Sequence, residues 1–194
     1  ESFEEAVEKD EDFEYQVEEI VPILDKLIAG EGAFHGSAVR VGRTGLELTY
    51  DFSSEDQGGD FLGQPVKISE GKMVCEKGRY QLTQMSFTSE MELQMNLTLT
   101  GRMFLLIRET RIELGEELIL RNMKDKNEIV KGKGIDVGKE ASLHIRIKNN
   151  KLDLSLDGKK ILSGSLPLEE GEDPNLGPFR FEVKKGEAIF SSPL

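Results

Sequence analysis

The residues of this chain that are best placed to do chemistry lie in one strand-like run, Glu90-Met91-Glu92-Leu93-Gln94. Side chains alternate across a β-strand, so the polar residues of this run share one face and the apolar residues share the other. Two carboxyl groups on one face of a strand are groups that general acid–base chemistry can use. The same groups can instead hydrogen-bond a glycan, or form the solvated side of a buried strand. The run therefore predicts a polar face whose chemistry depends on its neighbours.

A second regular stretch, residues 144–161, supplies basic side chains that could lie beside this face. Asn149-Asn150 and Asp157-Gly158 each fit a two-residue hairpin turn, because these residue types tolerate positive φ. The predicted meander has one apolar face with the pairs Ile147–Leu152, Ile145–Leu154 and Leu143–Leu156, and with Ile161 opposite Leu154. Its wet face carries His144, Arg146, Lys148, Lys151, Asp153, Ser155 and Lys159. The candidate ligand-binding residues are Glu90, Glu92, Gln94, Arg146 and Lys148.

Metal ligands are harder to find. Calcium is the candidate cofactor, since two acidic stretches offer oxygen ligands, but neither has the ligand spacing of a dedicated calcium loop. The stretches hold Asp51, Glu55, Asp56 and Asp60, and Glu169, Glu170, Glu172, Asp173 and Asn175. His35 and His144 are far apart, and the single Cys75 excludes a cysteine zinc site and an intrachain disulfide. We expect no resident cofactor, with calcium left open.

The composition excludes several classes of partner. The net charge of −12 argues against nucleic acid and anionic membranes, which need a concentrated basic surface. No run approaches the roughly 20 apolar residues of a membrane-spanning helix, so we expect no membrane insertion. The chain has no Trp, and its three Tyr make a strong sugar-stacking platform hard to assemble. Protein or glycan remains as the partner; the compartment is open, with an extracytoplasmic one favoured.

Hydrophobic periodicity predicts strands from residue 34 onward. The period is two, and Gly and Asp punctuate the runs at short intervals, without intervening amphipathic helices. The expected strands are 34–41, 46–52, 66–69, 73–75, 80–87, 90–100, 103–108, 118–123, 128–130, the meander, 179–184 and 187–190. This spacing indicates an all-β, two-sheet antiparallel sandwich or barrel.

The first residues follow a different rule. Phe13, Val17, Ile20, Leu24 and Leu27 recur every three or four positions, which predicts an N-terminal amphipathic helix that Gly30 and Gly32 end. This helix either packs on its own domain, or acts as a linker or contact helix towards a neighbouring helical region or a second copy in a homodimer. We therefore divide the chain into a helical leader or linker, 1–32, and a β-sandwich domain, 33–194, of a larger multidomain protein.

The order of these segments resembles the jelly-roll domains of the concanavalin A-like lectin and glucanase superfamily, most closely laminin G-like domains and the bacterial three-keto-disaccharide hydrolase-type domain. The resemblance covers residues 34–194 and is carried by LELTYDFSSEDQGGDF, SEMELQMNLTLTG, ASLHIRIKNNKLDLSLDGKKI and LGPFRFEVKKGEAIFSSPL. It implies a jelly-roll sandwich. The superfamily's β-glucanases carry a Glu-x-Asp-x-(x)-Glu strand, whereas here Gln94 stands where a proton donor is needed, and an amide cannot serve.

Three functional classes follow. A noncatalytic interaction module that binds protein or glycan fits the missing acid and the missing Trp best. A carbohydrate-active enzyme of the glycoside hydrolase type is the alternative, and it would need a carboxylate pair that only folding brings together. A purely structural spacer is the third.

Overall fold

The computed structural model describes residues 34–42, 45–87, 90–167 and 175–192. Residues Gly36–Leu194 form one compact unit, separate from Glu1–His35. The predicted amphipathic helix and most of the late acidic loop lie outside the described residues. Within the described part of the chain, no helix is long and apolar enough to cross a membrane.

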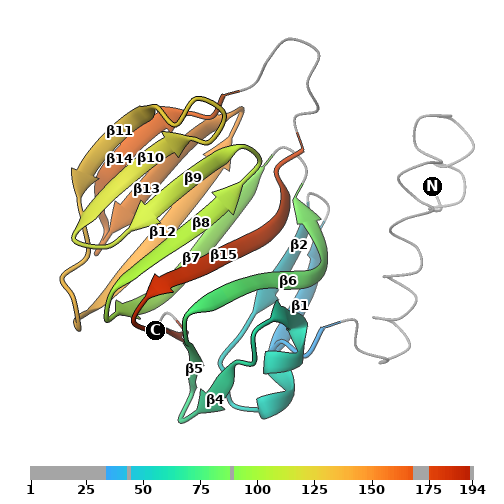
Figure 1. Ribbon diagram of the computed structural model, residues 1–194. Coiled ribbons are helices and arrows are strands. Elements are labelled where there is room, and N and C mark those ends of the chain that lie inside the picture. The colour runs from blue at the N-terminus through green and yellow to red at the C-terminus, as the bar shows by residue number, and fades with distance from the viewer. Residues whose placement is uncertain (1–33, 43–44, 88–89, 168–174, 193–194) are drawn as a thin grey trace, which may run out of the picture. The chain divides into compact units, whose positions relative to one another are not determined.

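The unit contains two seven-stranded antiparallel sheets and a separate two-stranded hairpin (Figure 1). Sheet 1 has the order β11 (Glu128–Lys133), β10 (Glu117–Asn122), β9 (Thr110–Leu114), β8 (Arg102–Ile107), β15 (Gly177–Lys185), β6 (Gly78–Phe87) and β3 (Phe61–Gly63). Sheet 2 has the order β14 (Lys159–Ser165), β13 (Lys151–Leu156), β12 (Glu140–Lys148), β7 (Met91–Leu99), β16 (Ala188–Ser191), β5 (Lys72–Cys75) and β4 (Lys67–Ser69). The hairpin joins β1 (Ala38–Gly42) to β2 (Gly45–Thr49), and a 3-10 helix, η1 (Glu55–Asp60), precedes β3.

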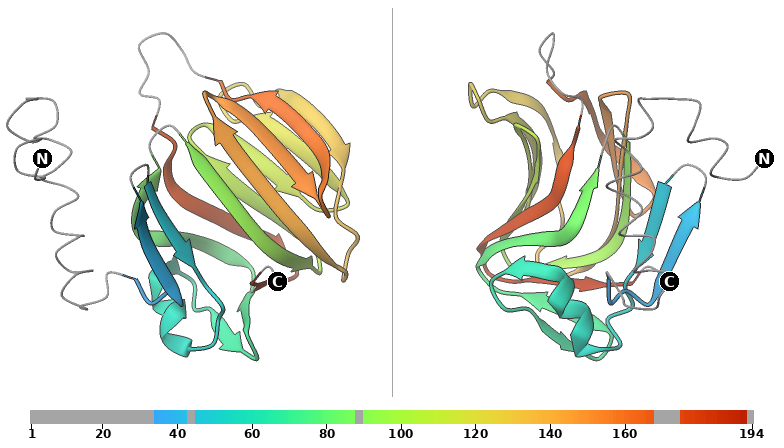
Figure 2. Two further views of the ribbon diagram at one scale, coloured as in Figure 1. Left: turned by 180° about the vertical axis from the view of Figure 1, so that it is seen from behind. Right: turned by 90° about the vertical axis from the view of Figure 1, so that its right-hand side faces the viewer.

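The two sheets stack as layers, and the chain crosses from one to the other at several points (Figure 2). β7 belongs to sheet 2 and β8 to sheet 1, and β15 and β16 are divided in the same way. Between these crossings the chain forms local meanders, β8 to β11 in sheet 1 and β12 to β14 in sheet 2. Neighbouring strands within each meander are therefore joined by short turns, and the C-terminal strands β15 and β16 are inserted one into each sheet.

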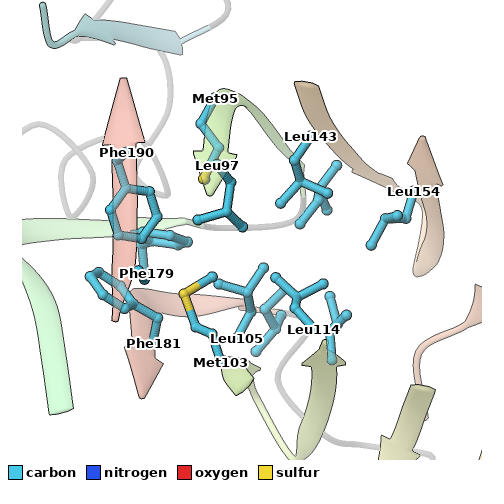
Figure 3. Close-up of a cluster of buried hydrophobic side chains, with 14 of the residues drawn as sticks. Met95, Leu97, Met103, Leu105, Leu114, Leu143, Leu154, Phe179, Phe181 and Phe190 are labelled. Carbon is cyan, nitrogen blue, oxygen red and sulfur yellow. The ribbon is translucent and has the colours of Figure 1, made fainter. Parts of the chain in front are cut away.

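Apolar side chains from the facing sides of the sheets form one core. Met95, Leu97, Leu143, Leu154 and Phe190 come from sheet 2, and Phe181, Met103, Leu105 and Leu114 come from sheet 1 (Figure 3). The Tyr80 and Phe181 rings stack at 4.9 Å between centroids within this layer. Alternate positions along each strand supply the core, so the intervening side chains point away from it and form the two outer faces.

Most of the predicted strands are confirmed, with ends that shift by a few residues. Two strands were missed, β3 and β9. The first strand was placed too early, since it begins at Ala38. The β-sandwich itself is confirmed, and the only described helix is the short η1.

The register predicted for the first hairpin of the meander is confirmed. Leu143, Ile145 and Ile147 lie opposite Leu156, Leu154 and Leu152. Both turn residues have positive φ, 50° at Asn149 and 60° at Asn150, as a two-residue turn of this kind requires. The second register was wrong by one residue. Leu154 pairs with Leu162 and not with Ile161, because a β-bulge between Leu154 and Ser155 shifts β14.

Candidate functional site

The predicted ligand-binding residues come together on the outer face of sheet 2. β7 pairs with β12 so that Glu92 lies opposite Arg146, and Gln94 lies opposite His144. Glu90 precedes β7, and its Oε1 lies 3.2 Å from Lys148 Nζ. We call this set, Glu90, Glu92, Gln94, His144, Arg146 and Lys148, the β7–β12 face. Sequence alone could not join its halves, because about 50 residues separate them in the chain.

The β7–β12 face consists of exposed side chains that contact one another loosely. His144 Nε2 lies 2.8 Å from Glu92 Oε1, and the Gln94 amide donates to the same oxygen at 3.4 Å. Glu92 and His144 keep 52% and 39% of their side-chain surface exposed. A depression there has a volume of about 130 Å³ and is lined by Glu90, Met91, Glu92, Arg146 and Ile147. It is a shallow polar surface with two carboxylates and no aromatic ring.

The outer face of sheet 1 is more ordered, although no residue on it was predicted as a ligand. Phe104 lies on the central strand β8, between Met103 and Leu105, which point into the core. In the register of the sheet Phe104 has Glu113 on one side and Glu182 on the other. Both Phe104 and Glu113 are 7% exposed. Since these side chains point away from the core, their burial must come from neighbours on the same outer face.

Those neighbours are cations. Arg111 and Arg121 are register partners on β9 and β10, and both donate to Glu113 Oε1, over 2.7 and 3.0 Å. The Arg111 guanidinium also covers the Phe104 ring at 4.5 Å from its centroid, and Lys184 Nζ lies 5.6 Å from the same centroid. We call this set, Phe104, Arg111, Glu113, Arg121, Glu182 and Lys184, the arginine face. Its members are fixed by one another rather than by the core.

The two carboxylates of the arginine face are held ionised by these cations. Burial alone would raise the pKa of Glu113, but the hydrogen bonds and charges of Arg121 and Arg111 outweigh it and lower the pKa. Burial opposes Lys184 and Arg79 in the same way at Glu182, and the net shift of its pKa is again downward. Neither group is suited to donate a proton near neutral pH.

A pocket opens at one end of the arginine face. It has a volume of about 340 Å³ and is lined by Arg111, Arg121, Asn122, Met123 and Lys126. Arg121 Nη1 donates to the Lys126 carbonyl oxygen at 3.0 Å, which ties the loop after β10 to the arginine pair. Three cations and one amide, with no carboxylate, therefore line this pocket.

The calcium candidates near β2 have structural partners of their own. One oxygen of Asp51 accepts from Gln57 Nε2 at 2.8 Å and from the Ser53 hydroxyl and backbone amide, which lowers the pKa of Asp51. Asp60 is buried and accepts from the Tyr50 hydroxyl at 2.8 Å. Burial and this carboxylate raise the pKa of Tyr50. Within the described ranges no three His, Cys, Asp or Glu side chains gather as a metal site.

Comparisons with known proteins address the fold. No family model matches the chain, and no curated protein matches it in sequence. Among solved structures, it is similar to the carbohydrate-binding module CBM66 from Bacillus subtilis, with a TM-score of 0.54 and 12% identity over 69% of this chain and 92% of that one. It is also similar to a protein of unknown function with a galectin-like fold from Bacillus subtilis. The TM-score is 0.55, with 9% identity over 73% of this chain and 91% of that one. For the potassium-bound carbohydrate recognition domain of Emp46p the TM-score is 0.51, with 10% identity over 70% of this chain and 87% of that one.

The chain has a lectin-like jelly-roll fold. At these identities the likeness concerns the backbone alone, and the residues of any site must be argued from this chain. The strand order and the two seven-stranded sheets are consistent with it. The jelly-roll expectation from sequence is thus confirmed at the level of fold.

Proposed function

We propose that the domain is a noncatalytic module that binds a glycan, and that the arginine face with its pocket is the binding surface. The observation that supports this proposal is that the protein already holds the polar side chains of this face in one geometry. Arg111 and Arg121 keep 28% and 24% of their side chains exposed, and Glu113 keeps 10%. Side chains already held in one geometry lose little conformational freedom when a ligand binds.

The chemistry of the arginine face suits a sugar. Hydroxyl groups need charged or amide partners, which Arg111, Arg121 and Asn122 offer at the pocket. The C–H surface of a sugar ring needs an apolar contact, and Met123 at the pocket edge is 45% exposed. Likeness of fold to carbohydrate-binding modules supports this class of ligand, and the finer assignment to laminin G-like domains remains a prediction.

The β7–β12 face is a second candidate surface for the same function. Its charged side chains and its depression could hydrogen-bond a glycan, as the sequence predicts. A hydrolytic role has less support. The Glu113 carboxylate is held ionised by two arginines, so it is not suited to donate a proton to a glycosidic oxygen.

The test is a glycan array on the full chain, followed by calorimetric titration of the strongest ligands with and without calcium. Arg111→Gln on the arginine face and Arg146→Gln on the β7–β12 face are matched substitutions. We expect Arg111→Gln to remove binding while the thermal midpoint shows that the protein is folded. Loss with Arg146→Gln alone would move the site to the β7–β12 face, and no glycan bound by the wild type would refute the function.

A further inference from the structure

We propose that the ligand of the arginine face carries an acidic group, a sugar carboxylate or sulfate, and that this group docks in the pocket lined by Arg111, Arg121 and Lys126. The inference rests on the proposed glycan binding and adds the chemical class of the glycan. It concerns one acidic sugar rather than a long polyanion, because the net charge of −12 disfavours an extended anionic chain across the surface.

The lining of the pocket is the first argument. Its side chains are two arginines, one lysine, an asparagine and a methionine. The depression on the β7–β12 face, by contrast, is lined by two glutamates and one arginine. In a chain with 37 acidic and 25 basic residues, a pocket without a carboxylate in its lining is a local reversal of charge. A reversal of this kind attracts an anion and repels a cation.

The second argument is that Glu113 uses only part of the hydrogen-bonding capacity of the two arginines. Glu113 accepts from Arg111 and Arg121 through one oxygen, Oε1. A second acid near Arg121 is Glu128, whose Oε2 lies 4.0 Å from Arg121 Nη2 and whose side chain is 43% exposed. One buried carboxylate therefore faces two guanidinium groups, and Lys126 adds a third cation to the lining. An arginine presents five N–H donors, so donors remain for a ligand oxygen.

A third argument is that arginine side chains continue from the pocket across the outer face of sheet 1. In the register of sheet 1, Arg111 and Arg180 both lie opposite Leu106, one on each side of it. The Nε atoms of Arg111 and Arg180 are buried and have no protein acceptor. Such under-used guanidinium groups are unusual where they serve only the fold, because buried donors are normally paired. They extend a basic row from the pocket across the centre of the sheet.

Apolar surface beside the cations decides between a sugar acid and a free anion. The exposed Met123 side chain lies in the lining of the pocket, and Leu106 is half-buried between the two arginines of the row. An inorganic anion would gain nothing from such contacts, whereas the C–H surface of a sugar ring would. The acidic group then fixes the orientation of the ring, and the apolar contacts add affinity.

The experiment compares glycans that end in a uronic acid, a sialic acid or a sulfated sugar with their carboxyl-reduced or desulfated neutral parents, by array and then by titration of the full chain. We expect the acid to bind about tenfold or more tightly than its reduced parent, the amount one charge-assisted hydrogen bond is worth. We expect its affinity to fall as sodium chloride is raised. Equal binding of acid and reduced parent would overturn the inference and leave glycan binding intact, whereas absence of all glycan binding would refute the proposed function itself.

Substitutions test the pocket without disturbing Glu113. Lys126 is exposed, so the Lys126→Gln variant should fold normally and bind the acidic glycan severalfold more weakly. The Lys126→Glu variant should bind it more weakly still. Lys72→Glu replaces an exposed lysine on β5 of sheet 2 and is the matched control. It should leave the affinity for both the acidic glycan and its neutral parent unchanged. Lys126→Glu weakening the reduced parent as much as the acid would contradict the proposal. Free sulfate that binds as tightly as the acidic glycan would also contradict it, because the sugar ring would then add nothing and the site would recognise an anion alone.

Discussion

Arg111 and Glu113 leave β9 on the same outer face of sheet 1, and the guanidinium Nη2 donates to the carboxylate Oε1 over 2.7 Å. Arg121, the register partner of Arg111 on β10, reaches the same oxygen over 3.0 Å. A carboxylate that is almost fully buried outside the core thus organises two cations. This relationship makes the outer face a preformed surface, and it yields the first prediction.

Replacing Glu113 should destabilise the domain and change its response to acid. Glu113→Gln leaves two guanidinium groups without their charged acceptor, which should cost about 1.5–3 kcal/mol of unfolding free energy, measured by urea denaturation at pH 7. The folded-state pKa of Glu113 is lowered, so its contribution is complete above the unfolded pKa of about 4.3 and is lost as the pH falls through the folded pKa. The difference between wild type and variant should therefore shrink in acid. A difference that stays constant from pH 7 to pH 3 would argue against this account.

The turn between β12 and β13 should tolerate glycine and reject a β-branched residue. Asn149 has a φ of 50°, a conformation that glycine adopts freely and valine does not. Asn149→Gly should leave the thermal midpoint unchanged or raise it, and Asn149→Val should cost about 1–2 kcal/mol. Asn150 is unsuitable for this comparison, because its Oδ1 also accepts from Arg108 Nη2 at 2.6 Å. Equal midpoints for the two Asn149 variants would show that the turn relaxes.

Cys75 should be inert in the folded protein. Its side chain is fully buried in β5, and burial raises the pKa of the thiol to about 12, so almost no thiolate exists at pH 8. A disulfide reagent should modify it slowly in buffer and rapidly in denaturing urea. Rapid labelling of the native protein would mean that sheet 2 opens near β5 without global unfolding.

The domain should not hydrolyse β-glucans. Gln94 cannot donate a proton, and loss of a general acid removes about 10²–10⁴-fold of rate. Laminarin, lichenan and agarose should therefore stay intact by reducing-end assay. Turnover that Glu90→Gln abolishes would show that this strand is catalytic after all.

Residues 33–194 should fold without the leader. The core lies among residues of the unit Gly36–Leu194, and its two sheets cover each other. The fragment should unfold cooperatively by heat, at a midpoint within a few degrees of that of the full chain. A molten or insoluble fragment would mean that the predicted helix belongs to the core.

The local meander was readable from the sequence, because short-range chemistry fixes it. Asn149 and Asn150 accept positive φ, and the alternation of Ile145 and Ile147 then allows only one register. The bulge after Leu154 escaped prediction, because both Ile161 and Leu162 are apolar and only packing selects between them. β9 was missed because its run is short and polar, although it alternates.

The sequence by itself determined an all-β architecture, the positions of most strands and one polar strand face, since periods of two record which side of each strand is buried. Only the tertiary structure decided where the cations meet. Arg111, Glu113 and Arg121 converge because a ladder sets β9 beside β10, and Phe104 is covered because those cations lie over it. Phe104 sits in the run Met103-Phe104-Leu105, which is apolar throughout, so period two vanishes at the centre of the sheet. Alternation reports burial by the core, and it is silent where an outer face is buried by its own side chains.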